Sequence, residues 1–355
     1  MAFSELKTFI KLTLLITLIL IVLLLVVSYF LAMFLGPVLM FSPDGLATSS
    51  QHRRLPILLF VIIGFYTPVA LNIGLVFLLL WSVFFICFVV AWKFRESFHG
   101  VIEKGFSPSM IKLFDNWLFA MPIVTSMLLI AVNVIHSFQE AHGIPTGEIS
   151  LPKNPFETFF ELSYAVLIEE IGFRVTPIGA FLIIYLFWVG RKNVATFSWG
   201  QRLKLFLTAP LYPDKAKKMV GVKTVSEFGV RGGISLGEWV MIFYTSIIFG
   251  LAHYLGGGGW EVGKVTSSSV VGLAMGLTYL FYGIQAPILL HWFFNYYQYV
   301  YFSSMPIIFV LINGVTVVLG LLGWLLVMIL GLRRMFSALS KKGVKSRLTS
   351  LSRTS

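Results

Sequence analysis

The stretch IEEIGFR at residues 168–174 places three charged side chains inside a segment, about 159–189, that otherwise has the composition of a membrane span. A charge at the centre of a membrane helix costs about 2.5–3.5 kcal/mol on insertion scales, so three together are expected to be paired or functional. Glu170 and Arg174 are four residues apart on a helix with the acid first, the favourable order for an ion pair. Glu169 is rotated by about 100° from Glu170 and is left to find other partners.

The composition places the chain among polytopic membrane proteins. Of its 355 residues 57% are hydrophobic and only 12% are charged, whereas a soluble domain carries about 25% charged residues. The net charge of +12 comes from basic loops, which the positive-inside rule explains without a nucleic-acid partner. The single cysteine, Cys87, excludes an intrachain disulfide and a cysteine-rich metal site. The first apolar run exceeds the ~7–15 residues of a signal-peptide core, so an uncleaved first span is expected.

We predict an all-α fold, a membrane helix bundle of about eight spans. The stretch 55–92 is too long for one crossing of a bilayer core of about 30 Å. It forms either one long span, broken near Gly64 and Pro68, or a two-span hairpin, and one span is preferred. Eight spans place the N-terminus in the cytoplasm and nine place it outside. The expected spans are about 12–35, 55–92, 117–136, 159–189, 238–255, 266–282, 285–302 and 306–332.

The loops differ in charge, which orients the bundle. Segment 93–112 is basic and amphipathic and is expected at the interface. The long loop 190–237 has nine Lys and Arg residues against two acids, while the loop before 159 is mainly acidic. The positive-inside rule therefore places loop 190–237 in the cytoplasm, where it faces the lipid surface.

Other spans carry polar residues that do not suit lipid. His253 ends the span 238–255, and His291 and Asn295 share one helix face inside 285–302. Such residues normally face a bundle interior and pair with one another. Because Glu169 is early in its span and His253 is late in the next, both are expected near the same membrane face. We predict that Glu169 meets both histidines and the amide in a wet pocket between helices.

Two smaller features accompany these residues. Pro177 cannot donate to the carbonyl of Phe173 and is expected to kink the helix beside the charges. Gly272 and Gly276 form a GxxxG face that permits close helix approach.

Together these residues resemble the CAAX protease and bacteriocin-processing family of intramembrane endopeptidases, which includes the Ras-converting CAAX prenyl proteases. The resemblance covers about Tyr164 to Gln298. It rests on three motifs in this order on separate spans: Glu169-Glu170-x-x-x-Arg174, Phe249-x-x-x-His253 and His291-x-x-x-Asn295.

The resemblance implies a role for each matched residue. Glu169 would be the general base, and His253, His291 and Asn295 would complete the catalytic set. Glu170 and Arg174 would support it. The chain then divides into N-terminal transmembrane helices without a motif (1–150), a catalytic intramembrane protease core (151–335) and a basic, cytoplasmic, disordered tail (336–355).

The chemistry that these four residues suit is hydrolysis of a peptide bond. A carboxylate in a low-dielectric bundle is a suitable base for water, with His253 orienting that water, and His291 and Asn295 can donate to an oxyanion. No serine or cysteine nucleophile is needed. The rival is zinc, held by Glu169, His253 and His291; the resemblance favours a metal-free site with no cofactor. The expected partners are membrane lipid and a peptide or protein substrate, either a prenylated CAAX tail or a leader-type peptide.

Other interpretations stay open from the residues alone. Glu170 and Arg174 can be a structural ion pair, with Glu169 as a second acceptor for the arginine. His253 can be an interfacial residue, and His291 and Asn295 an interhelical hydrogen-bond pair. Buried Glu and His also suit a proton-coupled transporter, and a non-catalytic membrane scaffold is a third class. In each case we expect a multi-pass protein of a prokaryotic plasma membrane.

Overall fold

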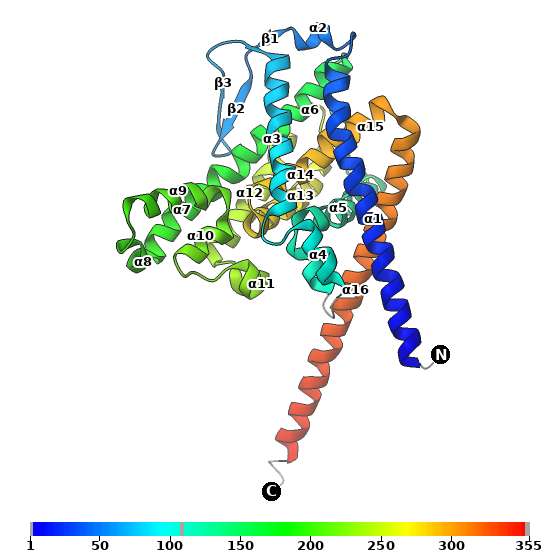
Figure 1. Cartoon of the computed structure of the whole chain (residues 1–355), viewed down its shortest axis with the longest axis vertical. Coiled ribbons are helices and arrows are strands. Elements are labelled where there is room, and N and C mark those ends of the chain that lie inside the picture. The colour runs from blue at the N-terminus through cyan, green and yellow to red at the C-terminus, as the bar shows by residue number, and fades with distance from the viewer. Residues whose placement is uncertain (1–2, 107–109, 352–355) are drawn as a thin grey trace.

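The protein is a bundle of long helices with both ends of the chain on the same side (Figure 1). The computed structural model describes residues 3–106 and 110–351. Seven helical segments of this described part are long and apolar enough to cross a membrane, which confirms the all-α membrane bundle. They are Thr8–Met40, Ile73–Gly105, Trp117–Ala141, Pro155–Val189, Leu236–Leu255, Gly263–Tyr282 and Pro306–Arg333.

Among the residues that the structure describes, helices dominate both halves of the chain and the strands lie in the first half. The first half has α1 (Phe3–Met40), α2 (Leu46–Ser49), β1 (His52–Arg53), β2 (Pro56–Leu59), β3 (Ile63–Tyr66), β4 (Leu71–Asn72), α3 (Ile73–Lys93), α4 (Phe98–Gly105), η1 (Met110–Asp115), α5 (Trp117–Ala141), α6 (Pro155–Glu170), η2 (Ile171–Val175) and α7 (Pro177–Val189). The second half, within the described residues, has α8 (Arg191–Ala195), α9 (Trp199–Leu211), α10 (Pro213–Met219), α11 (Val225–Gly233), α12 (Leu236–Leu255), α13 (Gly263–Tyr282), α14 (Gln285–Trp292), η3 (Phe293–Tyr297), α15 (Gln298–Ser304) and α16 (Pro306–Leu351).

The stretch 55–92 is neither a kinked span nor a two-span hairpin. Its first part forms the antiparallel pair β2–β3, and β1 pairs with β4 beside it. The helix α3 begins only at Ile73, where the side chain of Asn72 caps it by accepting from Leu75 N at 2.9 Å. Proline at 56 and 68 and a run of β-branched and aromatic residues favour strands over helix. The two-span hairpin, and with it the count of nine spans, is therefore wrong.

The predicted span 285–302 is a continuous helical run of α14, η3 and α15 in the interior of the bundle. Every residue of α14 is buried, packed among α3, α5, α6 and α13. The GxxxG face lies where α13 packs on α12: a Cβ at Gly276 would stand 2.9 Å from Ile242 Cγ2. Close approach of these two helices therefore depends on the missing side chains.

Two predicted irregular segments are helical. The segment 190–237 folds into the short helices α8 to α11, which pack on α7 and α13. The last helix, α16, continues to Leu351 and so runs through most of the predicted disordered tail. A long helix-forming sequence without proline after 306 accounts for this continuation.

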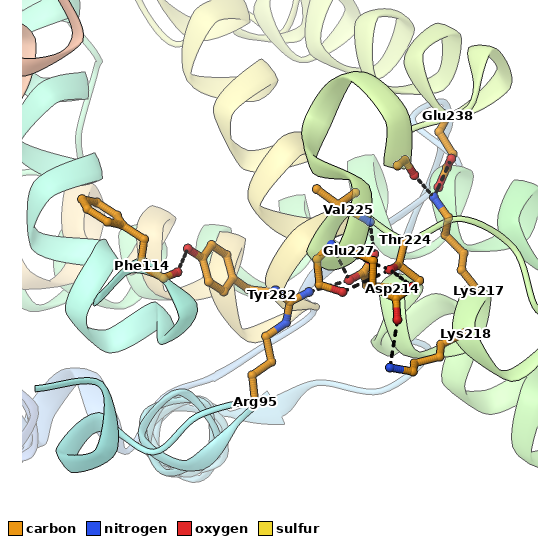
Figure 2. A network of polar contacts seen from close by, with 12 residues as sticks. Arg95, Phe114, Asp214, Lys217, Lys218, Thr224, Val225, Glu227, Glu238 and Tyr282 are labelled. Atoms are coloured by element: carbon orange, nitrogen blue, oxygen red, sulfur yellow. Dashed lines mark hydrogen bonds and ion pairs between the residues drawn. The ribbon is translucent and has the colours of Figure 1, made fainter. Parts of the chain in front are cut away.

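Some charges of segment 190–237 are buried, contrary to a solvated loop. Lys217 donates to both oxygens of Glu238, at 2.9 and 3.0 Å, and to the carbonyl of Gly233. Figure 2 shows Lys217 and Glu238 pointing toward one another. Asp214 accepts from Arg95 Nη2 at 2.6 Å and from the amides of Val225 and Ser226. These bonds tie α10 to α11, to the start of α12 and to the segment after α3. Basic residues of this segment and of the segment after α3 therefore help to hold the fold together.

Replacing Asp214 by Asn is expected to lower the free energy of unfolding by about 1–3 kcal/mol, because the charged acceptor of Arg95 and of two amides is lost. Thermal unfolding in nanodiscs measures this change. Asp44→Asn, at an exposed position, is the matched control and should alter stability by less than about 0.5 kcal/mol. Equal effects of the two substitutions would contradict the structural role of Asp214.

Candidate active site

The acidic pair lies at a change of helix type. Asn154 caps α6 by accepting from Phe156 N at 2.9 Å, and Pro155 occupies the first turn. The α-helix ends at Glu170, and the next turn, η2, is a π-helix in which Thr176 N bonds to Ile171 O. Pro177 has no N–H to donate, so the expected irregularity takes the form of this π-turn. Such turns are frequent at functional sites.

Glu170 and Arg174 form the predicted ion pair. Arg174 Nη1 donates to Glu170 Oε1 at 3.0 Å, and both side chains are almost fully buried. The guanidinium lies 4.4 Å above the Phe249 ring, a cation–π contact from α12. A Cβ at Gly272 would stand 3.4 Å from Arg174 Nη2. Phe249 and Gly272 therefore also form the pocket around the Arg174 guanidinium.

His291 continues this network from α14. Its Nδ1 is 2.9 Å from Glu170 Oε1, and Asn295 Nδ2 is 3.3 Å from its Nε2 and 3.2 Å from the carbonyl oxygen of Leu162. A carbonyl only accepts, so the Asn295 atom facing Leu162 is the amide nitrogen. Glu170, which is held by Arg174, can only accept, so His291 Nδ1–H donates the hydrogen bond to it. A neutral His291 then accepts from Asn295 at Nε2, and the chain of bonds fixes its tautomer.

Glu169 differs from its neighbour in having no close charged partner among the residues that the structure describes. Its side chain is 28% exposed, and the nearest basic group is His291 Nε2, 3.8 Å from Oε2. No hydrogen bond to Oε2 is present among the described residues. Glu169 lines a cavity of about 450 Å³ together with His253, His291 and Asn295. The structure therefore brings the four predicted catalytic residues to one cavity.

His253 belongs to the end of α12. Its Nδ1 donates to the carbonyl of Phe249 at 2.8 Å, four residues earlier. Because that carbonyl can only accept, Nδ1 carries the proton and Nε2 is the unprotonated nitrogen of the neutral ring. His253 Nε2 and the Glu169 carboxylate line the same cavity, and two such acceptors can hold a water molecule between them.

The zinc alternative can be compared with this geometry. In the part of the chain that the structure describes, no group of three or more His, Cys, Asp and Glu side chains is placed to hold a metal ion. Glu169, His253 and His291 share the cavity without forming a ligand set. These residues therefore do not fit a zinc ion in this arrangement, and we derive no step through a metal.

Several residues of the cavity wall were not predicted from the sequence. Leu58 and Val61 come from the β2–β3 hairpin, which was assigned to a membrane span. Val61 N donates to Gly172 O at 3.0 Å, and Phe60 N to Thr176 Oγ1 at 2.7 Å, so the hairpin tip lies against the π-turn. Lys264 lines the cavity from the first turn of α13. The available signal was a lysine two residues before the predicted span 266–282.

Comparison with known proteins finds a family that part of the chain resembles. Residues 152–297 match the family described as type II CAAX prenyl endopeptidase Rce1-like. The matched range contains all six predicted site residues. No curated protein and no solved structure matches the chain. This range includes all the cavity motifs, so the part of the chain that holds the candidate site is similar to the type II CAAX prenyl endopeptidases, a family of membrane proteases.

Proposed function

We propose that the protein hydrolyses a peptide bond near the membrane surface with water activated by Glu169. The observation that carries this proposal is the unpaired Glu169 carboxylate in a cavity shared with His253, His291 and Asn295. A base must be free to take a proton, and the carboxylates of ion pairs, such as Glu170, are not. Glu169 is the acid of the site that meets this requirement.

The water is held by two acceptors. It donates one hydrogen to Glu169 and the other to His253 Nε2, which turns an oxygen lone pair towards the scissile carbonyl carbon. Attack forms the new C–O bond as Glu169 takes the proton. The protonated acid then gives this proton to the leaving nitrogen, the C–N bond breaks, and the products are a carboxylic acid and an amine.

Asn295 is the proposed donor to the oxyanion. Both of its amide hydrogens are engaged in the free protein, one of them in the long contact of 3.3 Å to His291. As negative charge develops on the carbonyl oxygen, Asn295 exchanges this contact for the stronger bond to the oxyanion. His291, fixed by Glu170, keeps Asn295 in position.

The substrate proposed is a membrane-anchored peptide of the CAAX type, with its prenyl chain in the lipid. Terminal proteomics tests the function because it detects cleavage at any sequence. Membranes containing the wild-type protein are compared with membranes containing Glu169→Gln. New C-termini and N-termini that appear only with the wild type support the proposal, and identical sets of termini contradict it.

Peptide hydrolysis by the purified protein is expected to survive treatment with 1,10-phenanthroline and EDTA, because the proposed mechanism uses no metal. The substrate peptide is one identified by the terminal proteomics. Its rate of cleavage by the treated protein is compared with its rate of cleavage by the untreated protein. A loss of activity that added zinc restores would contradict the metal-free mechanism and return Glu169, His253 and His291 to the role of ligands.

A further inference from the structure

The β2–β3 hairpin turns part of its backbone away from its own ladder, on the side of the active-site cavity. Its register places Leu58 opposite Gly64, and Thr67 N donates to Leu55 O at 2.9 Å just outside the strands. In an antiparallel ladder, hydrogen-bonded pairs alternate with pairs whose N–H and C=O groups point outward. Because Leu55 and Thr67 are bonded, Leu58 and Gly64 form an outward-pointing pair.

The outer edge of β2 is fixed against α6 and the π-turn. Tyr164 Oη donates to Pro56 O at 2.7 Å, and Phe60 N donates to Thr176 Oγ1 at 2.7 Å. Leu58 lies midway between these two anchored residues. In the described part of the chain, no hydrogen bond outside the ladder reaches the N–H or the C=O of Leu58. The edge of β2 therefore carries one donor and one acceptor that are still to be paired.

The tip of the hairpin is held in a strained backbone conformation. Phe60 and Val61 have φ values of 49° and 72°, which are costly for residues other than glycine and most of all for a β-branched one. The tip is tied down where Val61 N donates to Gly172 O at 3.0 Å, in the turn that follows Glu169. Strain that the surroundings hold in place is common at ligand-binding sites.

Leu58 is also the residue of β2 that borders the cavity. Leu58 and Glu169 both line the volume of about 450 Å³, whereas no residue of β3 lines it. Gly257 and Gly258 form another part of the wall, and a Cβ at either would meet nothing within 4 Å. The cavity therefore has room for a peptide main chain. Unpaired backbone groups in apolar surroundings require a partner, and an extended peptide can supply it.

We propose that the substrate binds as an added strand on the edge of β2, where one of its residues exchanges hydrogen bonds with the N–H and C=O of Leu58. Strand addition to an open sheet edge is a recurring mode of peptide recognition. The inference rests on the proposed function and deepens it, because it makes an extended main chain the feature that is recognised. A substrate segment that is helical in the membrane then has to unwind before it reaches Glu169.

Binding of an uncharged peptide tests the inference independently of cleavage. The probe is acetyl-Thr-Val-Ser-Leu-Thr-Val-amide, measured by calorimetry on the full chain in nanodiscs with Glu169→Gln, so that no hydrolysis accompanies binding. A set of the same peptide with one N-methylated amide each locates the pairing. We expect methylation to weaken binding about 5- to 50-fold at the residue that faces Leu58 and to be tolerated at its two neighbours, because successive amides of a strand point to opposite sides.

Three variants separate the backbone of Leu58 from its side chain. Leu58→Pro removes the outward N–H and keeps the ladder, and it should weaken binding of the parent peptide about 5- to 50-fold. Leu58→Ala keeps the N–H and should retain most of the affinity. Gly64→Pro makes the same backbone change on the far edge, where a Cβ would meet nothing within 4 Å, and should leave the dissociation constant unchanged. Near-ultraviolet circular dichroism reports whether each variant is folded.

Distinct outcomes judge the two proposals. Equal weakening by Leu58→Pro and Leu58→Ala, a methylation penalty without alternation, or no binding of the parent peptide would overturn strand addition. New termini in wild-type membranes would still support Glu169-dependent hydrolysis in each of these cases. A selective loss of binding in Leu58→Pro, in a protein that produces no new termini in membranes, would support the added strand and contradict the proposed function.

Discussion

Glu169→Gln is expected to lower the rate of peptide hydrolysis by about 10²- to 10⁴-fold, the usual contribution of a positioned general base. The amide has nearly the same shape but cannot accept a proton from water. The protein should remain folded, because the Glu169 side chain is partly exposed and has no ion pair within hydrogen-bonding distance. The measurement is kcat on a cleaved peptide, compared with the midpoint of thermal unfolding.

Glu161→Gln is the matched control for this prediction. Glu161 lies two turns earlier on α6, with a side chain that is 48% exposed and a single weak contact of 3.4 Å to Arg53. Its replacement should leave kcat unchanged. If Glu169→Gln retained the wild-type rate, another group would have to activate the water, and His253 with its free Nε2 would become the first candidate.

Arg174→Met is expected to destabilise the protein by about 3–5 kcal/mol, because it leaves the carboxylate of Glu170 buried without its charged partner. It should also lower kcat by about 10²-fold, since Glu170 then holds His291 less firmly and the catalytic groups shift. Unfolding in mixed micelles measures the first effect and peptide cleavage the second. Arg54→Met, at an exposed position, serves as the control for loss of an arginine.

The double variant Glu170→Leu with Arg174→Met separates stability from function. Removing both charges of a buried pair is often neutral or stabilising, so most of the lost stability should return. Activity should remain low, because leucine offers no acceptor to His291 Nδ1. Recovery of both properties would show that the pair does not position His291.

The site is recognisable from the sequence to the extent that it depends on local geometry. The four-residue spacing of Glu170 and Arg174 places them on one helix face in any helical context, and their pairing at 3.0 Å follows. The same spacing joins His291 to Asn295. Membrane insertion makes such residues costly unless they face inward, and this constraint predicted that His253 would meet them.

The β2–β3 hairpin could not be predicted from local sequence patterns. Residues 56–66 are as apolar as a membrane span, and their strand pairing could not be separated from a helix by hydrophobicity. The decisive contact is with the π-turn, where Val61 N donates to Gly172 O. A bond between segments more than 100 residues apart leaves no periodic signal in either segment.

The sequence by itself determines an α-helical membrane bundle with an acid–arginine pair and two histidine motifs on separate spans. These features follow from helix periodicity and from the cost of burying charge, which both act on neighbouring residues. The tertiary structure alone decides that Lys217 and Asp214 are buried, and that the β2–β3 hairpin and Lys264 line the cavity. The physical reason is that a charge is paired or free according to which helices pack around it, and that packing joins residues distant in the chain.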